Sequence, residues 1–215
     1  MEDLCDSTLI HVDVDQISLE GMLSIPLQAR GLVLFAHGSG SSRLSPRNNY
    51  VAKILREEGL GTLLIDLLSK EEDEDYEKRF DIDLLEKRLL AVIDYLKKQP
   101  RTKGLALGLF GASTGAAAAL KAAALSKQVK AVVSRGGRPD LAKEALSMVE
   151  APMLFIVGGD DFEVLELNKE AFAQLQAIKK LEIVPGATHL FEEPGCLEEV
   201  AKLSAKWFVL YLITQ

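Results

Sequence analysis

Short apolar runs alternate with longer helical stretches along most of the chain, and this alternation constrains the fold more than any other feature. The runs carry apolar side chains at successive positions, which indicates strands buried on both faces. They are GLVLFAH (31–37), GTLLID (61–66), GLALGLF (104–110), KAVVS (130–134), PMLFIVG (152–158) and LEIV (181–184). Helices are expected at 46–58, 81–98, 114–126, 139–149, 163–179 and 196–213. The pattern predicts an α/β fold with a mostly parallel sheet and helices on both of its faces.

The beginning of the chain follows a different pattern. Apolar and polar residues alternate in TLIHVDVDQISLEGMLSIP (8–26), which predicts an antiparallel hairpin with a turn near Asp15–Gln16. The segment SKEEDEDYEKR (69–79) is strongly charged, so we expect a solvated loop that leads into the next helix. We find no internal repeat and no linker, and therefore expect a single domain over residues 1–215.

Composition excludes several classes of function. A formal net charge of -7 offers no basic surface for a phosphate backbone, so a nucleic-acid partner is not expected. The start, MEDLCDSTLI, lacks a basic region followed by an apolar stretch, and no run reaches the roughly 18 apolar residues that cross a bilayer. Cys5 and Cys196 are too few for a disulfide framework. We expect a reduced, cytoplasmic protein that does not associate with membranes.

A serine stands at the sharpest predicted turn of the chain. Gly111-Ala112-Ser113-Thr114-Gly115 matches G-x-S-x-G and lies between a predicted strand and a predicted helix. Such a turn strains the backbone at the serine and leaves no room for side chains two residues away, which explains the glycines. It also lifts the hydroxyl above the sheet at the start of a helix, whose dipole favours negative charge. Ser113 is therefore the candidate nucleophile.

A second loop supplies small residues at the same edge of the sheet. His37-Gly38-Ser39-Gly40 follows the strand at 31–37 and leaves backbone N–H groups uncovered. A phosphate-binding loop is the alternative, but the pattern G-x-x-x-x-G-K-[ST] is absent. Acyl transfer needs two donors for the oxyanion, and we expect these to be the N–H groups of Ser39 and Thr114.

Two further loops contribute an acid and a base. GGDDFEV (158–164) follows one predicted strand, and PGATH (185–189) follows the last one. A serine hydroxyl needs a base to act as a nucleophile, and the base needs an anion that orients it. His189 has the required position, whereas His11 lies in the hairpin and His37 in the glycine-rich loop. The order Ser…Asp…His is typical of α/β-hydrolases.

On these motifs the sequence resembles the α/β-hydrolases, and within them the dienelactone hydrolase family. The resemblance rests on HGSG, GASTG, GGDD and GATH, and it extends from GLVLFAHGSGSS to the closing helix. It implies an α/β-hydrolase fold with the acid in a G-x-x-D-x-x-[VP] turn. Gly158, Asp161 and Val164 match that turn, so Asp161 is preferred over Asp160.

The resemblance has one departure. The namesake enzymes carry a cysteine nucleophile where this chain has Ser113, which leaves the dienelactone substrate open but keeps acyl-transfer chemistry. Related domains also occur fused to phosphoribosyltransferase domains.

Metal chemistry finds little support in the sequence. The histidines are scattered and neither H-E-x-x-H nor C-x-x-C occurs, so we expect no metal and no cofactor. Asp160 and Asp161 as a calcium pair would need further oxygen ligands. Cys196 follows His189 by seven residues, and we expect it to pack at the start of a helix rather than act as a nucleophile.

Three arginines fall in loops that follow strands: Arg43, Arg135 and Arg138. A guanidinium suits a carboxylate or phosphate group, so these residues are candidates for binding an anionic substrate. The alternative is that they pair with the abundant Asp and Glu side chains or reach solvent. The sequence leaves both interpretations open.

Together these features predict a serine hydrolase that cleaves a small ester or thioester through Ser113, His189 and Asp161. The alternative is a non-catalytic α/β-hydrolase-fold protein that holds a ligand in the same pocket. The segment RGGRPDLAKEALSMVEA (135–151) suffices for one helix but not for a lid domain, so we expect an open site.

Overall fold

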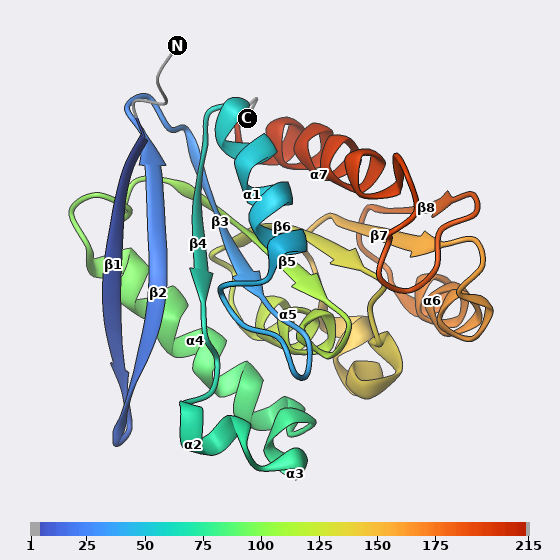
Figure 1. Cartoon of the computed structure of the whole chain (residues 1–215), viewed down its shortest axis with the longest axis horizontal. Helices are drawn as coiled ribbons and strands as arrows, with labels where there is room; N and C mark the ends of the chain where they lie inside the picture. Colours follow the sequence, from blue (N-terminus) through green and yellow to red (C-terminus); the bar gives the residue numbers. More distant parts are fainter. Residues whose placement is uncertain (1–4, 214–215) are drawn as a thin grey trace.

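The computed structural model describes residues 5–213, which build one eight-stranded sheet flanked by helices (Figure 1). The strands are β1 (Cys5–Val14), β2 (Ile17–Pro26), β3 (Gly31–Ala36), β4 (Leu60–Ile65), β5 (Ala106–Ala112), β6 (Val129–Arg135), β7 (Met153–Gly158) and β8 (Lys179–Val184). The helical segments are α1 (Pro46–Glu57), α2 (Lys70–Asp73), α3 (Tyr76–Arg79), α4 (Ile82–Lys98), α5 (Thr114–Leu125), the 3₁₀ segment η1 (Pro139–Met148), α6 (Phe162–Gln174) and α7 (Cys196–Leu212). The predictions that the chain lacks a signal peptide and forms a single domain over 1–215 include residues 1–4 and 214–215, which lie outside the described residues.

The strands follow the order β1-β2-β4-β3-β5-β6-β7-β8 across the sheet. β2 pairs antiparallel with both β1 and β4, and the pairs from β4 to β8 are parallel. The hairpin turns between the paired residues Val14 and Ile17, where Asp15 has a φ of 53°. The predicted mostly parallel sheet with an antiparallel hairpin at its N-terminal side is therefore confirmed.

Helices cover both faces of the sheet, as predicted (Figure 1). α4, α5 and α6 pack on one face and α1 and α7 on the other. Alternation along β6 shows the two sides: Val132 belongs to the first apolar cluster, whereas Ala131 and Val133 belong to the second. The alanine-rich α5 is buried along most of its length, since its small side chains allow a close approach to the sheet.

The charged segment 69–79 differs from the prediction. Instead of a loop it contains two one-turn helices, α2 and α3. Ser69 and Glu72 form a capping box at the start of α2, and Glu72 also binds the buried Arg88 of α4 (3.1 Å). This ion pair and the local cap hold the acidic segment against the fold despite its charge.

Two other predicted helices are shorter or less regular than expected. The helix predicted at 163–179 ends at Gln174, and Lys179 already begins β8. The Lys179 ammonium donates to the carbonyl oxygens of Phe172 and Leu175 (both 2.6 Å), which have no partner within the helix. A cation therefore caps the end of α6, where no glycine or proline follows the helix. Residues 139–148 form a 3₁₀ segment that is kinked at Ala142. It is the only helical segment between β6 and β7 in the described chain, which agrees with the absence of a lid domain.

Phe35 tests the packing of the sheet core. Its ring is fully buried and stacks on Phe110 with ring centroids 4.8 Å apart. We expect Phe35→Ala to lower the free energy of unfolding by about 3–5 kcal/mol, because it leaves a cavity. Leu27→Ala, at an exposed leucine, is the matched control and should change it by less than about 0.5 kcal/mol. Denaturant titration measures both, and equal losses would contradict this assignment of the core.

Candidate active site

Ser113 lies at a strained turn between β5 and α5. Its backbone has φ 51° and ψ −121°, a region that residues other than glycine rarely adopt. A Cβ at Gly111 would come within 2.4 Å of the Ala116 Cα, and one at Gly115 within 2.3 Å of the carbonyl oxygens of Ala36 and His37. Both flanking glycines are therefore required by close backbone contacts, as the G-x-S-x-G pattern predicts.

His189 bridges the serine and an aspartate. Its Nδ1 lies 2.6 Å from Asp161 Oδ2, and its Nε2 lies 3.3 Å from Ser113 Oγ. The carboxylate accepts the Nδ1–H, which leaves Nε2 as an acceptor for the serine hydroxyl. Asp160 is exposed, and no hydrogen bond of its carboxylate is found within residues 5–213. The structure therefore brings together the three residues predicted from the sequence, and Asp161 faces the imidazole.

The loops that carry Asp161 and His189 are joined by backbone contacts. The Asp160 N–H donates to the Ala187 carbonyl (3.0 Å), and the Gly159 N–H to the Val184 carbonyl (2.8 Å). A Cβ at Gly158 would come within 2.3 Å of the Ala187 carbonyl oxygen. The acid and base are thus positioned by one interlocked pair of loops at the carboxyl ends of β7 and β8.

The profile of the dienelactone hydrolase family matches residues 19–208. The chain belongs to the dienelactone hydrolase family. This family membership agrees with the resemblance that HGSG, GASTG, GGDD and GATH carry in the sequence. A crystal structure of a dienelactone hydrolase from Anabaena variabilis is 54% identical and has a TM-score of 0.94, with 97% of this chain and 99% of that chain covered.

Two other similar proteins are a longer curated relative and a solved structure of lower sequence identity. A Mycobacterium tuberculosis protein named "Putative phosphoribosyl transferase" is 54% identical over 204 residues, which are 94% of this chain but 46% of that protein. The chain therefore spans about half the length of the curated relatives it matches. Est1E from Butyrivibrio proteoclasticus is 19% identical with a TM-score of 0.81, covering 94% of this chain and 98% of that chain, and shares the fold.

The glycine-rich loop of this dienelactone hydrolase family member lies directly on the serine. A Cβ at Gly38 would come within 3.1 Å of Ser113 Cβ. The Ser39 N–H donates to Thr114 Oγ1 (2.9 Å), so this predicted oxyanion donor already has an acceptor. The Thr114 N–H stands at the first position of α5, where helix geometry provides no intrahelical acceptor.

His37 has a structural role that the sequence did not reveal. It is buried, its Nδ1 lies 3.0 Å from the Gly38 carbonyl oxygen, and its Nε2 accepts the Leu67 N–H (3.0 Å). These bonds require the neutral ring with its proton on Nδ1. His37 thereby connects the glycine-rich loop to the chain after β4. The position of His37 after an apolar run predicts the glycine-rich loop, but it does not predict the hydrogen bond to Leu67.

The three arginines predicted at the site have different surroundings. Arg43 pairs with Asp66 and with Glu20 (2.7 Å), and Arg138 binds Asp140 through two nitrogens (2.9 and 2.8 Å). These two guanidinium groups are occupied by carboxylates of the chain itself, the alternative that the sequence left open. Arg135 is buried, and no hydrogen bond of its side chain is found in the described part of the chain.

No cluster of three or more metal-ligating side chains occurs among residues 5–213.

Cys196 is buried in the α7 side of the core, and burial raises the pKa of its thiol. Among residues 5–213 no helix is long and apolar enough to cross a membrane.

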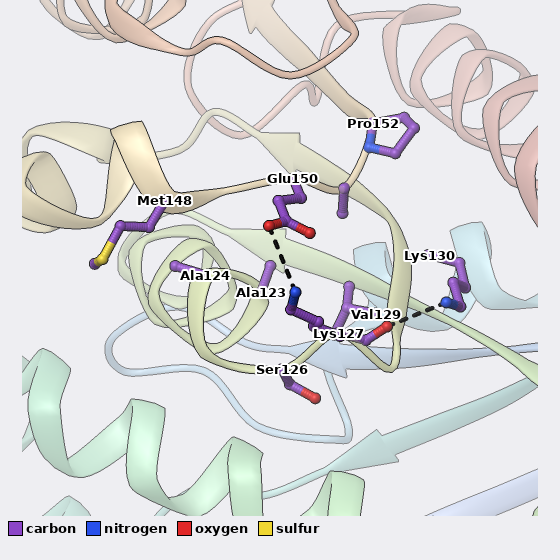
Figure 2. A pocket seen from close by; sticks show the side chains of 10 residues that line it. Ala123, Ala124, Ser126, Lys127, Val129, Lys130, Met148, Glu150 and Pro152 are labelled. Carbon is purple, nitrogen blue, oxygen red and sulfur yellow. Dashed lines mark hydrogen bonds and ion pairs between the residues drawn. The ribbon is translucent and has the colours of Figure 1, made fainter.

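Of two cavities in the described part of the chain, one lies beside the glycine-rich loop and the other lies far from Ser113. One of about 190 Å³ is lined by His37, Ser41, Ser42, Arg43, Asp66 and Lys70, among others, and adjoins the glycine-rich loop. A larger one of about 330 Å³ is shown in Figure 2 between the end of α5, η1 and the start of β7. Lys127 and Glu150 form an ion pair across it (3.8 Å). Val129, which begins β6, and Pro152, which precedes β7, line this cavity. The cavity therefore lies at the amino ends of these strands, whereas Ser113 follows the carboxyl end of β5.

His37 makes stability depend on pH. Burial lowers the pKa of its imidazole, so the unfolded chain binds a proton more readily than the folded one. Stability from the neutral ring is present above the unfolded pKa of about 6.5 and is lost as the pH falls below it. We expect the melting temperature to decline over this range and His37→Gln to reduce the decline.

His11→Gln is the control, because His11 is exposed on the hairpin. It should keep the acid dependence of the wild-type protein. Thermal denaturation across the pH range measures all three proteins, and an unchanged acid dependence in His37→Gln would contradict the assignment.

Proposed function

We propose that this member of the dienelactone hydrolase family is a serine hydrolase that cleaves a small carboxylic ester or thioester. The observation that carries the proposal is His189, whose two ring nitrogens face Asp161 Oδ2 (2.6 Å) and Ser113 Oγ (3.3 Å). A base held between an acid and a hydroxyl is the arrangement that activates a serine nucleophile. The family membership and the 54% identical dienelactone hydrolase support hydrolysis as the reaction class.

In the proposed reaction, Ser113 Oγ attacks the ester carbonyl carbon while its proton passes to His189 Nε2. The imidazolium then returns this proton to the leaving alcohol or thiol, and an acyl-serine remains. Water attacks the acyl-serine with His189 again as the base, which releases the acid and restores the serine. Asp161 accepts the Nδ1–H throughout and stabilises the imidazolium.

The proposed oxyanion donors are the N–H groups of Thr114 and Ser39. The helix dipole of α5 adds positive potential at Thr114. Ser39 binds the Thr114 hydroxyl oxygen, which marks a position where an oxygen acceptor fits against this N–H. For Ser39 to donate to the oxyanion, the Thr114 hydroxyl must turn away or share the donor. The substrate oxygen therefore has to displace the Thr114 hydroxyl from the Ser39 N–H or share this donor with it.

The alternative is a protein that binds a ligand at the same site without turnover. A binding protein does not require the hydrogen-bonded order of acid, base and hydroxyl, so this geometry favours catalysis. The transferase name of the Mycobacterium tuberculosis relatives applies to proteins of which more than half lies outside the match.

Ser113→Ala and His189→Ala test the proposed nucleophile and base. Each should lower kcat for p-nitrophenyl acetate by roughly 10⁶-fold, because either change removes the coupled proton transfer and attack. The double variant should be little worse than either single one, since the two groups act as a unit. Additive losses would contradict a nucleophile and base that act as a unit, and turnover that does not depend on Ser113 would favour the binding protein.

Asp161→Asn and Asp160→Asn form a matched pair that tests the acid. An amide at position 161 no longer fixes the Nδ1–H tautomer, so kcat should fall by roughly 10⁴-fold. The same change at the exposed Asp160 should alter kcat by less than about twofold. If Asp160→Asn were the more damaging variant, the assignment of Asp161 would be wrong.

A further inference from the structure

β8 is an edge strand whose outer side has no partner strand among residues 5–213. It lies beyond β7 at one end of the sheet and pairs with β7 alone (Figure 1). The Met153 N–H of β7 donates to the Ile178 carbonyl (2.8 Å), and backbone direction alternates along a strand. The N–H and C=O groups that face outward are therefore those of Lys179, Leu181 and Ile183. No hydrogen bond of these outward groups is found in the described chain.

The side chains beside this open edge leave it accessible. Lys179 turns away from it, because its ammonium donates to carbonyl oxygens at the end of α6 and lies 4.8 Å from the ring centre of Phe172. Ile183 is 45% exposed, and Ile178, directly before β8, is 63% exposed. An open strand edge with exposed isoleucines is a surface on which a further strand can pair.

Two charged side chains on the other face of β8 indicate a second copy of this chain as the partner. Lys180 and Glu182 form an ion pair within the chain (2.6 Å), and their side chains are 60% and 28% exposed. Antiparallel pairing centred on Leu181 places Lys180 of each copy directly opposite Glu182 of the other. Pairing centred on Lys180 or on Glu182 would instead place two like charges opposite each other, which is destabilising. Of these three registers, the one centred on Leu181 alone is complementary in charge.

The same register also pairs the outward backbone groups and the exposed apolar side chains. Leu181 exchanges both of its outward groups with Leu181 of the second copy, and Lys179 does so with Ile183. Ile178 comes to lie opposite Val184 of the second copy, which covers part of its exposed surface. One short strand is thus complementary to its own copy in hydrogen bonding, in charge and in apolar contact.

The opposite edge of the sheet lacks this complementarity. β1 carries Asp6, His11 and Asp13 but neither lysine nor arginine. A second copy of β1 therefore offers no permanent cation to these carboxylates. Asp6 is instead bound by Arg101 of the same chain (2.9 Å). Charge thus favours β8 over β1 as the edge that pairs with a second copy.

We propose that the chain forms a two-fold symmetric dimer through antiparallel pairing of β8 with β8 of a second copy. The pairing joins the two eight-stranded sheets into one continuous sheet. Because the two copies run in opposite directions, the carboxyl ends of their parallel strands lie at opposite edges of the joined sheet. The interface therefore lies away from both Ser113 turns, which follow β5, and the dimer does not depend on the proposed ester hydrolysis.

The molar mass in solution tests the dimer. Sedimentation equilibrium of the wild-type protein at about 50 µM should give twice the chain mass of 23.5 kDa. Lys180→Glu and Glu182→Lys each place like charges opposite each other, so each should raise the dimer dissociation constant by about tenfold or more. An equal mixture of the two variants should recover the dimer, because every carboxylate of one variant then faces an ammonium of the other.

Lys53→Glu is the matched control for these charge reversals. It breaks a similar exposed ion pair, between Lys53 and Glu57 of α1 (3.9 Å), at a site away from β8. It should keep the dissociation constant of the wild-type protein. A wild-type protein that stays monomeric, a dimer that either charge variant leaves unchanged, or a mixture that does not recover the dimer would overturn the proposal.

Amide hydrogen exchange tests which strand forms the interface. The N–H of Glu182 faces β7 in both monomer and dimer, whereas the N–H groups of Leu181 and Ile183 find acceptors only in the dimer. Residue-resolved exchange by NMR should therefore be roughly tenfold faster at Leu181 and Ile183 in Lys180→Glu than in the wild-type protein, and similar at Glu182. Equal exchange at Leu181 in the two proteins would overturn the pairing of β8.

Discussion

The strained turn at Ser113 is the constraint on which the rest of the site depends. A residue with φ 51° and ψ −121° is held there by close backbone contacts, and Gly111 and Gly115 allow these contacts because they lack a Cβ. The same turn ends β5, begins α5 and presses Ser113 Cβ against Gly38 of the neighbouring loop. Strain of this kind persists only where the surrounding fold enforces it, and here the parallel strands on either side of β5 do so.

Parallel strands explain why residues far apart in the sequence meet at this turn. The carboxyl ends of β3, β5, β7 and β8 lie at one edge of the sheet, and each is followed by a loop that contributes one part of the proposed machinery. The loops are fixed to one another by backbone hydrogen bonds, as between Asp160 and Ala187. The acid and base are therefore positioned by the sheet rather than by long flexible side chains.

Much of the fold and of the candidate site follows from sequence pattern, because both depend on local signals and on one topological rule. Apolar runs located the strands, and the loops after them located Ser113 and His189, while the choice of Asp161 over Asp160 came from the family resemblance. The pairing of Arg43 with Glu20 and Asp66 depends on distant elements, so no local pattern could reveal it. The spacing of Ser69 and Glu72 is typical of a helix start, but the prediction of a loop at 69–79 was based on the charge of the segment.

Covalent labelling tests the central claim of a serine nucleophile most directly. A fluorophosphonate loses fluoride when an activated serine attacks its phosphorus, and the mass of the protein then increases by the phosphonyl group. Peptide mapping by mass spectrometry should place this group on Ser113, and Asp161→Asn should slow its attachment because the base is no longer oriented. A protein that stays unlabelled, or that carries the group on another residue, would contradict the account.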